Sequence, residues 1–324
     1  MKKIIALMLC IFPICFAFAE KLPVIIDTDA STDDAIALLY LLKTPTVDIK
    51  AIVVDTNGAS AANTAANHVA YLLKMLNKTQ IPVYVGITKQ PAFNNVYPPY
   101  AKKLIDDSFQ VNNVKPAVQI NKQQLIDIIQ QQKKEVTVLS LGSLTNIANL
   151  LTTTPQLKKQ IHSLIVMGGA VNVAGNIDAF IPKTENHYAE WNIYVDPESF
   201  QQVLTFNLPI TLVALDVTNH VPVTEEFMQT LSQHLTTPSA QFVYTMLHEN
   251  DQYIKNGEYD FWDPLAAYVL VHPAKTKTIK IDVKLTHDDH YAQIYETTAG
   301  YPIQLVTTVN QKAVEQAYID VLTK

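Results

Sequence analysis

The chain has 324 residues, of which 48% are hydrophobic and 17% are charged, and all of its 24 basic residues are lysines. A formal charge of −6 and the absence of arginine argue against nucleic acid or an anionic membrane surface as a partner, and against bidentate recognition of phosphate. A neutral or cationic small molecule is therefore the expected ligand.

The first 19 residues have the pattern of an export signal. Lys2 and Lys3 precede the apolar run 4–18, and Ala17-Phe18-Ala19 is a small-x-small cleavage site. This pattern predicts a signal peptide over 1–19 and an exported protein, periplasmic or secreted. The run is too short to predict a membrane anchor. Both cysteines lie inside this segment, so neither disulfides nor thiolate metal ligands are expected in the single domain predicted over 20–324.

Residues 23–39 predict a strand, a turn and a helix. Residues 24–26 form a short apolar run that is typical of a buried strand, and the apolar residues after position 34 recur at helical spacing. Ser31 or Thr32 is the expected N-cap. The turn therefore lies at the carboxyl end of a strand, where open α/β sheets bind their ligands.

This turn carries four aspartates, Asp27, Asp29, Asp33 and Asp34. Carboxylates this close together raise one another's pKa, and a helix N-terminus offsets only part of the repulsion. A divalent cation would offset more, and a set of oxygen ligands without a nearby thiol or histidine favours Ca²⁺ or Mg²⁺ over Zn²⁺. Helix capping without a bound ion is the simpler alternative.

The rest of the chain alternates apolar runs with helical stretches and contains a long loop with aromatic residues and prolines over 88–100. Further strands are expected over 47–54, 83–86, 136–142, 163–167, 212–215, 278–285 and 303–308, and helices over 61–76, 122–134, 143–151, 224–257 and 312–322. This order predicts an α/β fold, an open, mostly parallel Rossmann-like sheet flanked by helices, with the active site at the carboxyl ends of the strands.

Six motifs in this order are similar to those of the calcium-dependent nucleoside hydrolases, the inosine-uridine-preferring family in the broad sense. They are Asp27-Thr-Asp-Ala-Ser-Thr-Asp-Asp, Gly142-Ser-Leu-Thr-Asn, Met167-Gly-Gly-Ala, Gly175-Asn176, Ala189-Glu-Trp-Asn-Ile-Tyr-Val-Asp-Pro and Trp262-Asp-Pro-Leu-Ala. The resemblance covers residues 24 to about 270. No motif is decisive alone, but the ordered set is specific.

The resemblance implies that Ca²⁺ is held by Asp29, Asp34, Asp263 and the backbone carbonyl of Thr145, with Asp27 supporting the cluster. It also implies a homodimer or homotetramer that acts on a small-molecule nucleoside.

The resemblance further places the sugar against five residues. Asp33 would bind ribose hydroxyls, and Asn176 and Glu190 would lie near the 5′-hydroxyl. Asn192 and Asn57 match two further sugar-binding positions, although the sequence around Asn57 departs from the commoner Gly-Asn order.

The implied reaction is hydrolysis of the N-glycosidic bond of a ribonucleoside, with a calcium-bound water as nucleophile and Asp29 as the general base. The transition state would resemble an oxocarbenium ion that nearby carboxylates stabilise.

Trp262 replaces the histidine that precedes the last calcium-binding aspartate in the inosine-uridine subgroup. This replacement resembles the purine-preferring inosine-adenosine-guanosine subgroup, in which aromatic rings stack on the base and raise its basicity. Trp262 would form one face of the base site, and Tyr97 or Tyr100 the other. His187 and His248 are the alternatives as general acids, and a pyrimidine or broad specificity is the alternative to purine preference.

Two other functions fit part of the sequence. Asp27 and Asp29 after a strand also match the nucleophile loop of haloacid-dehalogenase-type phosphatases, which would leave the later motifs without a role. The export signal and α/β pattern suit a periplasmic nucleoside-binding protein, but such a protein needs no cluster of metal-binding carboxylates.

Overall fold

A computed structural model describes residues 20–60, 62–89, 96–109, 114–272 and 274–324. The signal peptide expected over 1–19 and part of the loop over 88–100 lie outside these residues. Within the described part of the chain, helices that combine the length and the apolar character needed to cross a membrane are absent.

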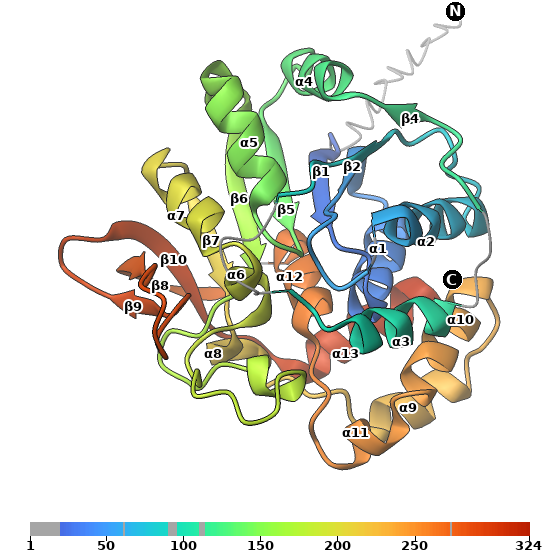
Figure 1. Ribbon diagram of the computed structural model, residues 1–324. Coiled ribbons are helices and arrows are strands. Elements are labelled where there is room, and N and C mark those ends of the chain that lie inside the picture. The colour runs from blue at the N-terminus through green and yellow to red at the C-terminus, as the bar shows by residue number, and fades with distance from the viewer. Residues whose placement is uncertain (1–19, 61, 90–95, 110–113, 273) are drawn as a thin grey trace, which may run out of the picture.

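The centre of the fold is a 10-stranded sheet with the order β4-β3-β2-β1-β5-β6-β7-β10-β8-β9 (Figure 1). Its strands are β1 (Leu22–Thr28), β2 (Val47–Val54), β3 (Val83–Val85), β4 (Gln119–Ile120), β5 (Val136–Ser140), β6 (Ile161–Met167), β7 (Ile210–Val213), β8 (Lys275–Val283), β9 (Ile294–Glu296) and β10 (Tyr301–Thr308). All pairings from β4 to β10 are parallel, whereas β8 and β9 pair in antiparallel fashion. The predicted open, mostly parallel α/β sheet is confirmed.

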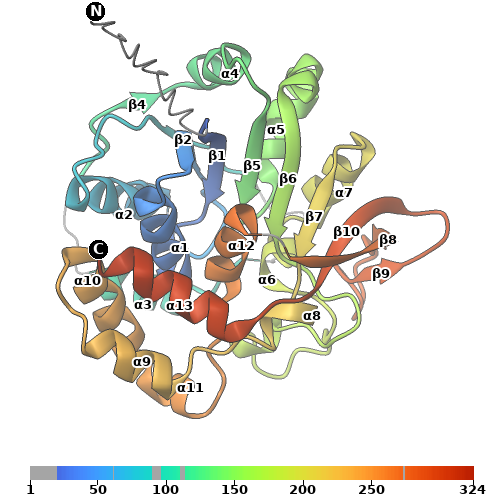
Figure 2. The same ribbon diagram turned by 180° about the vertical axis from the view of Figure 1, so that it is seen from behind.

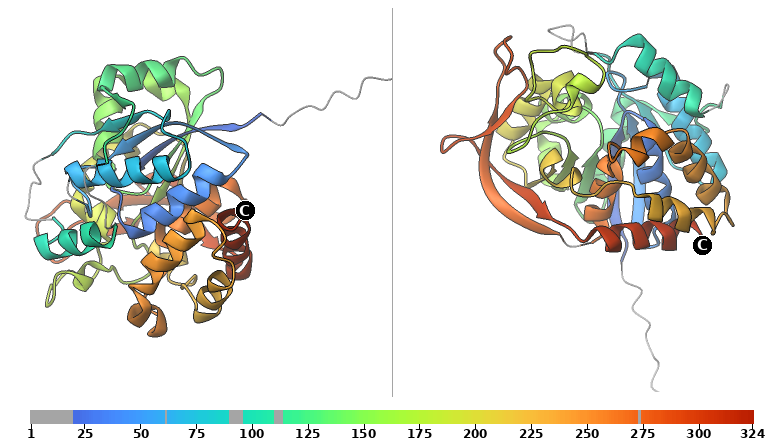
Figure 3. Two further views of the ribbon diagram at one scale, coloured as in Figure 1. Left: turned by 90° about the vertical axis from the view of Figure 1, so that its right-hand side faces the viewer. Right: turned by 90° about the horizontal axis from the view of Figure 1, so that it is seen from below.

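Helices cover both faces of the sheet, as Figures 2 and 3 show. They are α1 (Thr32–Lys43), α2 (Ala62–Met75), α3 (Pro99–Phe109), α4 (Lys122–Gln130), α5 (Thr145–Thr153), α6 (Trp191–Val195), α7 (Pro197–Thr205), α8 (Leu215–Thr218), α9 (Glu225–Ser232), α10 (Pro238–His248), α11 (Asp251–Lys255), α12 (Trp262–Val271) and α13 (Gln311–Leu322), with short 3-10 turns over Pro155–Gln160 and Ile177–Ala179. Helices α1, α12 and α13 belong to the hydrophobic core on one face, and α4, α5 and α7 to the core on the other.

Strand β1 shows why the central strands are apolar throughout. The side chains of Val24 and Ile26 lie in one core and that of Ile25 lies in the other, because successive residues of a strand point to opposite faces. All three are fully buried. The sequence of a parallel strand that is covered by helices on both faces therefore lacks an alternation of polar and apolar residues.

The order of the strands changes direction at β1, because β2 pairs with one edge of β1 and β5 pairs with the other. Open α/β sheets bind their ligands at such a switch point, outside the carboxyl ends of the strands. Asp27 of β1 lies in register with Ser140 of β5, so the turns that follow these two strands meet there.

Candidate active site

The turn after β1 is built by its own capping contacts. Ser31 is the N-cap of α1, and its backbone N–H and hydroxyl both donate to Oδ2 of Asp34, at 3.1 and 2.8 Å. Further hydroxyl donors reach Asp33 from Ser31 and Asp34 from Thr28. This confirms Ser31 as the cap and directs both carboxylates of the first helical turn to the sheet edge.

A third carboxylate joins Asp33 and Asp34 from far along the chain. Helix α12 packs against α1 and brings in Asp263, so that one oxygen from each of the three residues lies within 4.8 Å of the others. Asp34 and Asp263 are buried, and Oδ1 of Asp263 has no hydrogen-bond partner among the described residues. A buried carboxylate oxygen without a donor is costly unless a cation satisfies it.

The pKa values of Asp29, Asp33 and Asp263 are raised. Burial raises the pKa of Asp29 well above its usual value and the negative charge of Asp34 adds to the shift. Burial and the charge of Asp34 also raise the pKa of Asp263, and together they raise the pKa of Asp33 to about 6. These upward pKa shifts therefore result from carboxylates that lie close together and away from water.

The segment after β2 encloses Asp29. The backbone N–H of Ala59 donates to Asp29 Oδ2 at 2.7 Å, and a Cβ added to Gly58 would lie only 2.2 Å from Asp29 Cβ. On the β5 side a Cβ on Gly142 would lie 3.2 Å from the same atom. The carboxylate of Asp29 is thus held between two turns that approach it by their backbones.

These donors suit a hard divalent cation. Asp29, Asp34 and Asp263 are buried carboxylates that repel one another, and Oδ1 of Asp263 lacks a donor among the described residues. Ca²⁺ and Mg²⁺ prefer such carboxylates together with backbone carbonyls. The residues present therefore fit the calcium that the sequence predicts.

Thr145 begins α5, and its hydroxyl donates to Asp196 Oδ2 at 2.6 Å and contacts Ser143 Oγ at 2.9 Å. Gly142 of this turn lies against Asp29. A metal-binding role for the Thr145 carbonyl stays a prediction.

Asp55 is a buried carboxylate for which the sequence predicts no role. It accepts from the hydroxyl of Ser143 and from the backbone N–H of Asn57 at 2.9 Å, and burial raises its pKa to about 6. The side chain of Asn57 donates to Thr145 Oγ1 at 3.3 Å. Asp55 therefore orients the turn that carries Asn57. The position of Asp55 directly after a strand is the feature of the sequence that could have indicated this role.

The residues expected at the sugar already make backbone contacts. The carboxylate of Glu190 accepts from the N–H groups of Gly169 at 2.8 Å and Asn192 at 2.9 Å. The Asn192 amide donates to the Leu141 carbonyl at 2.9 Å, and Asn176 accepts from the Trp191 N–H at 3.1 Å. These contacts hold Glu190 against the turn after β6 and Asn192 against the turn after β5, and they join Asn176 to the start of α6.

Trp262 lies beside the cluster. It is the first residue of α12, directly before Asp263, and is half-buried. Its ring centroid is 5.1 Å from that of Tyr259, whose hydroxyl lies 3.4 Å from Thr32 Oγ1. Burial and then the negative charge of Asp33 raise the pKa of Tyr259, so the pair of rings formed by Tyr259 and Trp262 lies near this carboxylate.

Of the two tyrosines proposed for the opposite face, Tyr97 is the one near the site. It is buried and stacks on Trp191 with the ring centroids 4.2 Å apart. Its pKa is raised by burial and then by the negative charges of the site carboxylates, beginning with Asp29. Tyr100 is 59% exposed, and its hydroxyl donates to the Phe180 carbonyl at 2.9 Å.

The two histidines considered as general acids are both exposed. His248 ends α10 and stacks on Tyr244 of the same helix, with centroids 5.7 Å apart. His187 lies in the loop before Glu190. Neither has a described contact with the carboxylate cluster.

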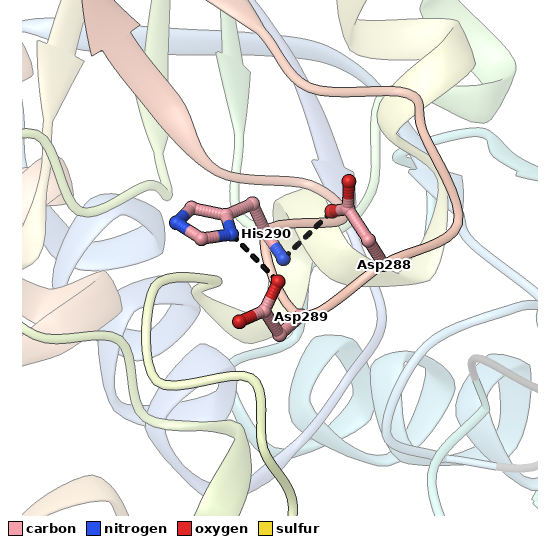
Figure 4. A group of neighbouring side chains, drawn as sticks. All are labelled: Asp288, Asp289 and His290. Carbon is pink, nitrogen blue, oxygen red and sulfur yellow. Dashed lines mark hydrogen bonds and ion pairs between the residues drawn. The ribbon is translucent and has the colours of Figure 1, made fainter.

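A second acidic group, Asp288, Asp289 and His290, lies in the loop between β8 and β9 at the far end of the sheet (Figure 4). The His290 N–H donates to Asp288 at 2.9 Å, and the His290 ring nitrogen lies 2.7 Å from Asp289. These contacts stabilise the turn and account for the grouping without an ion.

Comparisons with known proteins identify the family. The model of the inosine-uridine preferring nucleoside hydrolase family matches residues 24–316. The chain belongs to this family. It is therefore a ribonucleoside hydrolase, and the phosphatase and binding-protein alternatives are wrong.

Relatives of this nucleoside hydrolase differ in the specificity that their names state. The pyrimidine-specific ribonucleoside hydrolase RihA of Escherichia coli is 29% identical and aligns over 93% of this chain and 97% of its own length. The inosine-uridine preferring nucleoside hydrolase of Bacillus anthracis gives a TM-score of 0.83 at 22% identity, over 93% of this chain and 99% of that one. The purine-preferring ribonucleoside hydrolase of Gardnerella vaginalis gives 0.78 at 21% identity, over 93% and 98%. The structural matches establish a shared fold.

Proposed function

We propose that this nucleoside hydrolase cleaves the N-glycosidic bond of purine ribonucleosides in a calcium-dependent reaction. The observation that carries the proposal is the position of Trp262 in the chain, directly before the buried Asp263, whose carboxylate groups with those of Asp33 and Asp34. A carboxylate cluster for the sugar and an aromatic surface for the base adjoin one another.

Asp29, Asp34 and Asp263 would hold the calcium ion, with a backbone carbonyl from the turn after β5. When bound, the ion would orient the 2′- and 3′-hydroxyls of the sugar and lower the pKa of a neighbouring water. Asp29 would accept the proton of the attacking water. The Ala59 N–H holds one oxygen of that carboxylate in place.

Asp33, Asn57, Asn176, Glu190 and Asn192 would hold the ribose. Developing positive charge at the sugar would be stabilised by the buried carboxylates, since electrostatic interactions are strong in a site with little water.

The departing base must gain a proton or be activated. The pKa of Tyr97 is raised by burial and by the charges of the site carboxylates, and Trp262 directly precedes Asp263, so we infer that stacking on these two rings raises the basicity of a purine. Water could then protonate the base without a histidine, which agrees with the exposed positions of His187 and His248.

A pyrimidine substrate is the second candidate, because the E. coli relatives at 29% identity are named pyrimidine-specific. One experiment separates the two. The purified protein is incubated with inosine, adenosine, guanosine, uridine or cytidine, with calcium or with excess chelator, and release of free base is measured. Turnover of purine nucleosides that is lost with chelator is expected. A preference for uridine or cytidine would overturn the purine assignment, and unchanged turnover in chelator would overturn the calcium dependence.

A further inference from the structure

Ala30, between Asp29 and Ser31, has an unfavourable backbone conformation. Its φ is +56°, in the left-handed region that residues with a Cβ rarely adopt. The turn that presents Asp29 and Asp34 thus depends on contacts that hold this residue, which is 1% exposed.

Two side chains from the segment after β2 hold the Ala30 carbonyl oxygen. Ser60 Oγ donates to it at 2.9 Å, and His68 Nδ1 lies 3.1 Å from it. A carbonyl oxygen only accepts, so the His68 proton that faces it is on Nδ1. His68 lies on α2 and is 1% exposed, and it is outside the machinery proposed for catalysis.

The other side of the His68 ring contacts α3, the helix that follows Tyr97 in the chain. The ring stacks on Phe109 with the centroids 3.6 Å apart and the planes 2° apart. His68 Nε2 lies 3.8 Å from Asp106 Oδ1, an atom that has no hydrogen-bond partner within the described residues. One side chain therefore joins α3 to the turn of Asp29.

We propose that His68 is a positioning residue, which holds the Ala30 carbonyl so that Asp29 and Asp34 are presented to the metal in one arrangement. Asp29 precedes Ala30, and the N–H of the following Ser31 donates to Asp34, so a change at the Ala30 peptide moves both carboxylates. The inference rests on the proposed calcium dependence.

Three variants test this role. His68→Phe keeps a ring for Phe109 and removes the donor, His68→Asn keeps an amide donor near the Nδ1 position, and Ser60→Ala removes the second donor to the same oxygen. Calcium binding to chelator-treated protein is measured by calorimetry, with turnover at saturating calcium and thermal unfolding alongside.

His68→Phe and Ser60→Ala should each weaken calcium binding about 10-fold, because a buried carbonyl loses a donor. His68→Asn should stay within about 3-fold of the unaltered enzyme. A merely structural role would lower the melting temperature and leave the calcium affinity of the folded protein unchanged.

Unchanged affinity in His68→Phe, or an equal loss in His68→Asn, would overturn the inference alone. If His68→Phe does not fold, unchanged affinity in Ser60→Ala would overturn it. An unaltered enzyme that binds no calcium would overturn the proposed metal dependence as well, so the two failures are distinguishable.

Discussion

The backbone N–H of Ala59 donates a hydrogen bond of 2.7 Å to Oδ2 of Asp29. A peptide group from the turn after β2 thereby fixes the carboxylate of the turn after β1. Because a backbone group of a neighbouring turn orients Asp29, the position of this carboxylate depends on the course of the backbone as well as on the side chains around it.

Asp29→Asn should reduce base release by about 10³-fold, because the amide cannot accept the proton of the attacking water. Folding should be preserved, since the amide oxygen can still accept from Ala59 and a neutral group relieves repulsion by Asp34. Turnover is measured with thermal unfolding as the control. Activity above about a tenth of the original would contradict the role as base.

Gly58→Ala should disrupt the site because the added Cβ would lie 2.2 Å from Asp29 Cβ and Oδ2. Calcium affinity and turnover are both expected to fall by about 10-fold or more, the effect of displacing a ligand carboxylate. Gly300→Ala is the matched control, since its Cβ would lie 2.4 Å from the Ile281 carbonyl oxygen at the other end of the sheet. It should lower the melting temperature alone, and an equal loss of calcium affinity in both variants would refute the local explanation.

Trp262→Ala should lower turnover of inosine by about 100-fold, the scale of assistance to a leaving group. A p-nitrophenyl riboside should lose much less, because its leaving group needs little activation. Trp262→Phe keeps a ring and should have an intermediate effect on inosine. Equal losses on both substrates would exclude stacking as the source of activation.

Tyr97→Ala should lower the kcat/KM for purine nucleosides by about 10-fold, the value of one aromatic stacking contact. Tyr100→Ala should change it by no more than about 2-fold, since that side chain is exposed and its hydroxyl binds the Phe180 carbonyl. The two variants are compared over the same panel of nucleosides. A larger loss of kcat/KM in Tyr100→Ala than in Tyr97→Ala would indicate that Tyr100, rather than Tyr97, contacts the base.

Without metal, the protein should lose stability as the pH rises from about 4 to about 6. Asp33 and Asp55 have folded pKa values of about 6 against a usual 3.8, so the folded state holds their protons more tightly than the unfolded state does. Stability falls wherever the folded state binds more protons. Thermal unfolding in chelator at about pH 4 and about pH 7 checks this, and Asp33→Asn should reduce the difference. A metal-free protein that is more stable at the higher pH would contradict the burial of these charges.

The sequence predicts the parallel part of the fold because its signals are local. Buried runs such as 24–26 and 47–54 and the cap at Ser31 depend on neighbouring residues alone. The 3-residue strand β9 and the 5-residue helix α6 are too short for periodicity to reveal. Strand β8 ends at Val283, although its apolar pattern continues to Leu285.

Convergence of Asp33, Asp34 and Asp263 could be anticipated from the family pattern, whereas the contacts of Asp55 and His68 could not. A lone aspartate after a strand is common in turns, and a histidine in an amphipathic helix has no pattern that names its partner. The choice between Tyr97 and Tyr100 depends on where the chain runs after β3. The directions of these two tyrosine side chains depend on tertiary packing, and the spacing of residues in the sequence does not predict it.

Asp34 and Asp263 come from the first and twelfth α-helices, and more than two thirds of the chain separates them. An ion held by both would act as a removable cross-link that closes most of the polypeptide into one loop. An unfolded chain keeps such distant ligands apart and would not bind the ion. The free energy of ion binding would therefore add to the free energy of unfolding of the whole protein rather than order one segment alone. A chain that ended before α12 would lack this closure.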